Sequence, residues 1–247
     1  MNTTVAAPER QQREPAATRP QAPRLDLYRG IHKALRACMA ETTTRIGCLD
    51  VTDRADLEDG LARLDELLDF CAGHVQHENE FVHTAIEARQ PGGSGRVANE
   101  HDEHVDSIAA LRQEASALRT ARAGDAAELA HRLYRHLALF VAENLQHMQI
   151  EETLHNAILW SCYGDDELLE IHGRLMASLS PQTHLLALRW MLPAAHPGER
   201  AMLIGAAKAQ MPPEALLSVL AAVRPRVDAG GWTKLCTAAG VDPSFCA

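Results

Sequence analysis

Large apolar side chains recur at steps of three and four along four stretches of the chain, near residues 25–46, 55–89, 97–123 and 126–158. This spacing is typical of a helix that buries one face. Short polar segments separate the stretches, and one of them, PGGSG at 91–95, contains the Pro and Gly that end helices and form turns. Short connections place successive helices antiparallel, so the pattern predicts an all-α, up-down four-helix bundle over residues 25–163.

The two ends of the chain have different patterns. Residues 1–24 contain four prolines and almost no large apolar side chains, so they are predicted to form a disordered tail. Residues 164–247 contain short apolar stretches punctuated by Pro and Gly, some with Pro in the first turn. This pattern predicts an additional helical segment at the C-terminus.

Polar residues interrupt the apolar faces of all four predicted helices. In chain order they are His32, His74, Glu78, His101, His104, His147 and Glu151. Burial of unpaired charge is costly, so a cation is expected among them. Mixed nitrogen and oxygen donors suit iron, manganese or zinc. Seven donors exceed the four of a structural zinc site, which makes two ions more natural. When residues are counted from the ends of the predicted antiparallel helices, these side chains lie within a few helical turns of the same level along the bundle axis.

Helical phase separates inward from outward residues around the second helix. Residues four apart share a helix face, so His74 and Glu78 can aim at one point, and His147 and Glu151 repeat that spacing. Glu80 lies about 200° round the axis from Glu78. His77, Glu80 and His83 are therefore predicted on outer faces.

Two nearby side chains have two readings each. Tyr28 is one turn before His32 and is either a core tyrosine or a partner of the metal site. His155 is either a partner of the ligands or a partly exposed histidine.

Composition narrows the classes of function. The net charge is −9 and the pI about 5.8, so the sequence gives no sign of a basic surface that would bind nucleic acid or an anionic membrane. No apolar run approaches the length of a membrane span. Six scattered cysteines without a C-x-x-C motif fit reduced thiols in the cytoplasm.

Four short motifs in order resemble a known family. IHKALR at 31–36, HVQHENEF at 74–81, EHDEH at 100–104 and HMQIEE at 147–152 look like the H…HxxxE…H…HxxxE pattern of haemerythrin-like (HHE cation-binding) domains. The resemblance covers about residues 25–163. It implies two non-haem iron ions, oxo- or hydroxo-bridged, with His32, His74, His101 and His147 as ligands and Glu78 and Glu151 as bridging carboxylates. His104 would be a fifth histidine ligand.

The resemblance implies that the protein binds or senses O₂, NO, peroxide or iron itself. Five histidines leave few negative ligands to stabilise high-valent iron, which favours binding or sensing over catalysis. A ferritin-like di-iron oxidase is an alternative, because Glu80 with His83 and Glu152 with His155 match its Glu-x-x-His spacing, although the first helix offers only Glu41. A second alternative is a regulatory protein that binds a protein partner through residues 165–247.

Overall fold

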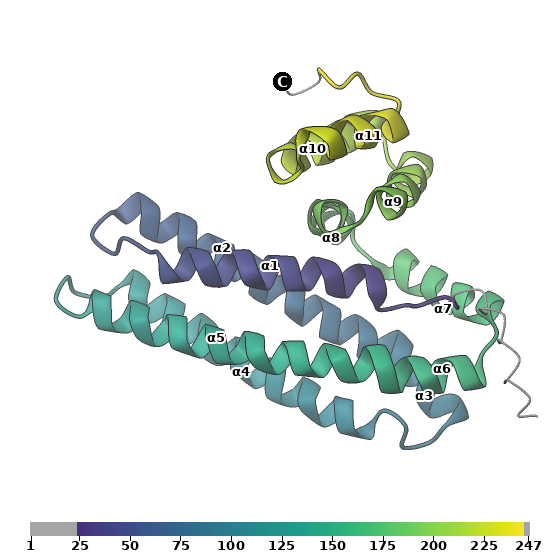
Figure 1. Cartoon of the computed structure of the whole chain (residues 1–247). Coiled ribbons are helices and arrows are strands. Elements are labelled where there is room, and N and C mark those ends of the chain that lie inside the picture. Colours follow the sequence, from purple (N-terminus) through teal and green to yellow (C-terminus); the bar gives the residue numbers. More distant parts are fainter. Residues whose placement is uncertain (1–23, 245–247) are drawn as a thin grey trace, which may run out of the picture.

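The computed structural model describes residues 24–244, and within that range it contains helices and their connections but no strand (Figure 1). The predicted all-helical class is thus confirmed. The predicted disordered tail lies outside the described residues except for Arg24. The guanidinium of Arg24 donates to the Asp165 carboxylate at 2.6 Å and to the Tyr163 carbonyl at 2.7 Å.

Four long helical segments occupy residues 29–162. They begin with α1 (Arg29–Gly47), α2 (Arg54–His77), α4 (Gly95–Arg119) and α5 (Ala126–Ile150). Two of them continue through a π-helical segment: α2 through η1 (Glu78–His83) into α3 (Thr84–Arg89), and α5 through η2 (Glu151–His155) into α6 (Asn156–Cys162). Helix α1 packs against α2 and α5, and α4 packs against the same two helices. The four segments therefore surround one core.

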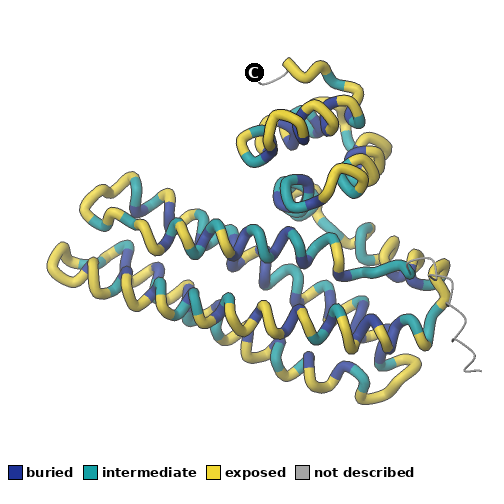
Figure 2. Tube along the Cα trace, viewed as in Figure 1, coloured by how far each residue is buried: buried dark blue, intermediate teal, exposed yellow. Residues whose placement is uncertain are grey.

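The core of these segments is built mainly from leucine. Leu61, Leu64, Leu111 and Leu133 have no measurable exposure, and Figure 2 shows the buried faces turned toward one another. Burial of one such side chain stabilises the fold by roughly 1.5–3 kcal/mol. The leucines fill the half of the helices that contains the turns after α1 and α4, and a second apolar cluster around Val82, Ile86 and Leu159 lies at the other end, with the polar residues between the two along the helices.

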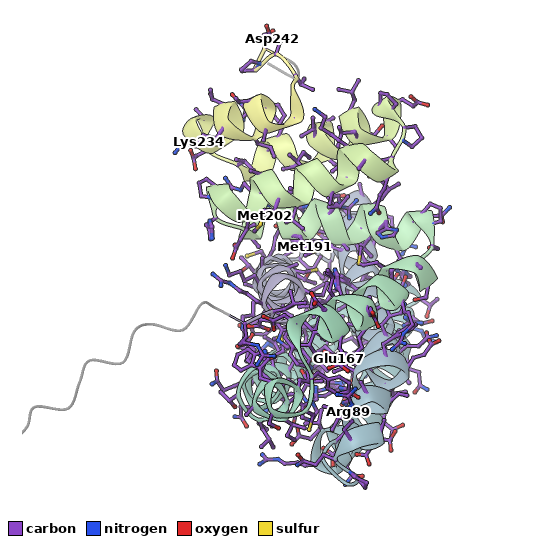
Figure 3. All side chains as sticks on the ribbon, turned by 90° about the vertical axis from the view of Figure 1, so that its right-hand side faces the viewer. Arg89, Glu167, Met191, Met202, Lys234 and Asp242 are labelled. Atoms are coloured by element: carbon purple, nitrogen blue, oxygen red, sulfur yellow. The ribbon has the colours of Figure 1, made fainter. Side chains whose placement is uncertain are left out.

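The C-terminal helices cover the long segments at two places. They are α7 (Asp165–Ser178), α8 (Pro181–Ala194), α9 (Pro197–Gln210), α10 (Pro213–Val223), the 3₁₀ turn η3 (Arg224–Arg226) and α11 (Ala229–Ala239). Helix α7 packs on η1, and Glu167 of α7 pairs with Arg89 at the end of α3 (Figure 3). Helix α8 packs on α1, and Met191 lies at this contact (Figure 3).

Helices α8 to α11 also share a core of their own, around Ile204, Leu220 and Trp232. Trp190 of α8 instead belongs to the core of the long segments, and its Nε1 donates to Glu66 of α2 at 3.0 Å. The C-terminal segment is therefore joined to the long helices by buried contacts. Among the described helices, none has the length and apolar content needed to cross a membrane.

Candidate metal centre

Both predicted carboxylates stand at the first residue of a π-helical segment. Glu78 begins η1 and Glu151 begins η2, each four residues after a histidine at the end of the preceding α-helix. A π segment has hydrogen bonds from i to i+5 and so holds about one extra residue per turn. Such segments are rare, and they are often found at functional sites. The two segments place both glutamates, 3% and 0% exposed, between the long helices.

Six of the seven predicted side chains come together there. Ligand atoms of one group lie within 4.8 Å of one another, and so do those of a second group. The first group is His32, His74, Glu78 and Glu151, and the second is Glu78, His101, His147 and Glu151. The same two carboxylates belong to both groups. This arrangement suits two cations that share Glu78 and Glu151.

Hydrogen bonds on the outer side set the tautomer of three imidazoles. Nδ1 of His32 lies 3.0 Å from a carboxylate oxygen of Glu152, and Nδ1 of His147 lies 2.9 Å from one of Glu100. Nδ1 of His101 lies 2.7 Å from the Asn79 amide oxygen. Oxygen atoms of this kind can only accept, so each Nδ1 carries the donated proton. The Nε2 lone pairs consequently point inward, as in metal sites whose ligands are oriented by outer carboxylates.

Most of the inward-facing atoms have no hydrogen-bond partner in the described structure. All four carboxylate oxygens of Glu78 and Glu151 are buried without a hydrogen bond, as are Nε2 of His32 and of His74. Leaving such a group unsatisfied costs about 1–3 kcal/mol. Nε2 of His101 and Nε2 of His147 are only 3.0 Å apart, so in the neutral tautomers favoured by Asn79 and Glu100 their lone pairs would face each other. A cation between the donors would remove these penalties together.

The separations also suit a shared cation. Two donors bound at ~2.1 Å to one ion lie about 3.0 Å apart at a right angle and about 3.4 Å apart at the tetrahedral angle. His74 Nε2 is 3.2 Å from a Glu78 oxygen, and Nε2 of both His32 and His147 is 3.4 Å from a Glu151 oxygen. The residues present therefore fit a metal pair.

The histidine pKa values also indicate that positive charge is favoured at the centre. Burial by itself would lower the pKa of His32, but its hydrogen bond to Glu152 and the nearby negative charges of Glu78 and Glu151 raise it to about 9. The pKa of His101 is raised to about 9 against burial by Glu151 and Glu78. Burial dominates at His74 and lowers its pKa to about 4. Without cations, protons on His32 and His101 would offset the two carboxylates.

His104 is the seventh predicted ligand, and its ligand atoms fall outside both groups. It is buried beside the site, with its ring centroid 4.7 Å from that of His147, and its Nδ1 has no hydrogen-bond partner in the described structure. Burial, followed by the neighbouring His147 and His101, lowers its pKa to about 4. His104 is a neutral imidazole at the edge of the centre.

Two histidines at the centre were not predicted as site residues. His83 was predicted on an outer face and His155 was left as a partner or a partly exposed residue, but they are only 5% and 0% exposed. Together with Glu151 they form a third group of ligand atoms within 4.8 Å. The prediction for His83 was wrong because it assumed 3.6 residues per turn through Glu78–His83, where the helix is π-helical.

A sequence signal for these histidines does exist. Each His-x-x-x-Glu pair is followed by one more histidine, His83 five residues after Glu78 and His155 four residues after Glu151. Tyr28 also belongs to the site, because its hydroxyl lies 3.0 Å from Nδ1 of His155. Tyr28 is 1% exposed, and burial and then the charges of Glu151 and Glu78 raise its pKa well above the usual value.

The carboxylates that a ferritin-like site needs do not meet. Glu80 is exposed. Glu152 lies on the outer side of His32, where Arg36 also donates to it at 2.5 Å. Glu41 pairs with Arg63 and Arg226.

Comparison with protein-family models, with curated proteins and with solved structures finds no match to this chain in any of the three. Conclusions about function therefore depend on the residues and geometry of the candidate metal centre.

Proposed function

We propose that residues 25–163 form a haemerythrin-like, up-down four-helix bundle that holds a non-haem di-iron centre and binds or senses a small oxidant. The ligand would be O₂, NO or peroxide, or the protein would sense iron itself. The observation that carries this proposal is the pair of four-residue groups with Glu78 and Glu151 in common. Two ions that share two carboxylates are the simplest occupants of such an arrangement.

The chain supplies distinct roles for its residues. His32 and His74 would hold one ion, His101 and His147 the other, and the two glutamates would link them. When bound, the iron pair would supply electrons to a small oxidant and take them back. Glu152, Asn79 and Glu100 keep three imidazoles oriented with Nε2 inward.

The donor set favours binding or sensing over strong oxidation chemistry. Four neutral imidazoles and two carboxylates contribute only two negative charges, which is little stabilisation for highly charged iron. The leucine-rich core on one side of the centre and the apolar cluster with Leu168 and Ile171 of α7 on the other restrict access of water. Both features suit a centre that cycles between two modest oxidation states.

Metal analysis with spectroscopy tests the proposal directly. Protein purified without oxygen and reconstituted with Fe(II) should hold about two irons per chain. On exposure to air it should develop an oxo-bridge charge-transfer band in the near ultraviolet, and NO should change the spectrum of the reduced form. The matched control is Glu80→Gln, an exposed glutamate two residues from Glu78, which should behave as wild type. A folded protein that takes up neither iron nor zinc would refute the proposal.

A regulatory role of the C-terminal segment is the second candidate, and one contact favours it. Glu199 of α9 pairs with Lys33 at 2.8 Å and with Arg29 at 3.0 Å, on the α1 turns that flank His32. Movement of α9 would thus act on the helix that carries a ligand. Truncation is a poor test because Trp190 fills the core of the long helices. Glu199→Gln should instead speed hydrogen exchange in α1 and metal release, and unchanged rates would argue against this role.

A further inference from the structure

Two imidazole nitrogens at the centre belong to neither four-residue ligand group, so they would bind neither of the two metal ions. Nε2 of His83 and Nε2 of His155 are buried and have no hydrogen-bond partner in the described structure. Both residues lie beside Glu151. The His83 ring stacks on that of His101, with centroids 4.7 Å apart and planes 6° from parallel, and it meets the His155 ring edge-on at 5.2 Å. The pair forms one wall of the centre.

Tyr28 contacts His155 at the nitrogen where it can set the tautomer of the imidazole. The Tyr28 hydroxyl is buried, and the hydrogen bond that the structure records for it is to His155 Nδ1 at 3.0 Å. A phenol O–H that donates to Nδ1 makes Nδ1 the acceptor, and a neutral imidazole then carries its proton on Nε2. With the phenol as donor, His155 carries its N–H at Nε2, the buried nitrogen that has no hydrogen-bond partner in the described structure. It would be a hydrogen-bond donor, whereas Nε2 of His32, His101 and His147 each offer a lone pair that can bind a metal ion.

The net charge of the centre indicates whether a cation or an anion would lie beside this N–H. Two divalent ions carry four positive charges, while Glu78 and Glu151 supply two negative charges. The outer carboxylates Glu100 and Glu152 are already paired with Arg96 and Arg36. A third cation at His83, Glu151 and His155 would enlarge a buried positive excess, and it would need a lone pair where His155 has a proton. A small anion reduces the excess and accepts the N–H.

We propose that His155, held in its Nε2–H tautomer by Tyr28, donates a hydrogen bond to a small inorganic anion bound at the metal pair beside Glu151, with His83 as the adjoining wall. The inference rests on the proposed function and specifies its ligand class. The site should prefer monoanions such as azide over neutral diatomic molecules of similar size, because a hydrogen bond to a charged acceptor is about twice as strong as one to a neutral acceptor.

The tautomer can be tested without any metal. Long-range ¹H–¹⁵N spectra of histidine-labelled, metal-free protein should show His155 with a protonated Nε2 and an unprotonated Nδ1. The Tyr28→Phe variant should shift the Nδ1 resonance. The matched control is Tyr163→Phe, which removes a phenol bonded to the Ala85 carbonyl at 2.7 Å in the same hydrophobic cluster. Protonated Nδ1 at His155 in the wild type would overturn the inference.

Azide titration of the iron-loaded protein tests the donor itself. The His155→Leu variant should raise the Kd for azide about tenfold or more, as expected for loss of a hydrogen bond to a charged group. His155→Gln keeps an N–H donor at similar reach and should stay within about threefold. Tyr28→Phe should raise the Kd about twofold to tenfold, and Tyr163→Phe should leave it unchanged. Affinity for NO should change little in all four.

The outcomes separate this inference from the proposed function. Wild-type protein that binds no metal contradicts the proposed function, and the tautomer measurement still decides the role of Tyr28. Wild-type protein with two irons whose azide affinity is the same in His155→Leu overturns the inference alone. A third metal equivalent that disappears in His155→Gln also overturns it, because His155 would then be a ligand. If His155→Leu does not fold, Tyr28→Phe against Tyr163→Phe carries the test.

Discussion

Replacement of Glu78 by glutamine removes one negative charge from the centre and keeps the size of the side chain. Glu78 belongs to both ligand groups, and its oxygens lie 3.2 Å from Nε2 of His74 and 3.4 Å from Nε2 of His101. Removal of one partner from a buried charge pair costs about 3–5 kcal/mol. Divided between two ions, this is about 1.5–2.5 kcal/mol each, so each Kd should rise roughly ten- to sixty-fold.

Competition against a chromophoric chelator measures this change. Anaerobic Fe(II) or Zn²⁺ titrations of wild type, Glu78→Gln and the exposed control Glu80→Gln give stoichiometry and both dissociation constants. We expect both ions to weaken together in Glu78→Gln and neither to weaken in Glu80→Gln. If only one ion weakens while the other keeps its wild-type affinity, Glu78 is not shared and the di-metal reasoning is refuted. Circular dichroism of the metal-free variants checks that helical content is preserved.

Three further predictions address the surroundings of the centre. Glu152→Leu, which removes the acceptor for His32 Nδ1, should weaken metal binding about 10- to 100-fold through the lost orientation of His32, measured by the same titration, and wild-type affinity would contradict this. The free energy of unfolding of the metal-free protein should peak near pH 6.5, measured by urea denaturation. The pKa of His32 is raised from 6.5 to about 9, so its contribution to folding stability is complete below pH 6.5 and is lost as the pH rises through 9. The pKa of His74 is lowered to about 4, so its contribution is complete above pH 6.5 and is lost as the pH falls through 4. Stability that rises steadily to pH 9 would speak against it. Trp190→Ala should lower the free energy of unfolding by about 3–5 kcal/mol, also by urea denaturation, since Trp190 is 3% exposed, and a loss below about 1 kcal/mol would show that α8 is not anchored there.

Much of this architecture follows from local patterning. Apolar steps of three and four predicted the helical class and the four long segments to within a few residues, because periodic burial is the dominant requirement on a helix. The same steps identified His32, His74, Glu78, His101, His147 and Glu151 as polar residues on buried faces, and the structure brings these six together. Polar groups on a buried face stand out in a sequence because they are costly there.

Other features were decided only by tertiary structure. Nothing in the spacing of residues 78–83 or 151–155 distinguishes a π segment from an α-helix, and that one extra residue per turn is what moved His83 from the predicted outer face to a buried position beside the centre. The hydrogen bond from Tyr28 to His155 joins residues 127 positions apart. The placement of Trp190 among the long helices and the sharing of two carboxylates likewise depend on how distant helices pack. The sequence by itself determined which residues had to be buried, whereas the packing determined which of them meet and which outer oxygen atoms orient the imidazole rings.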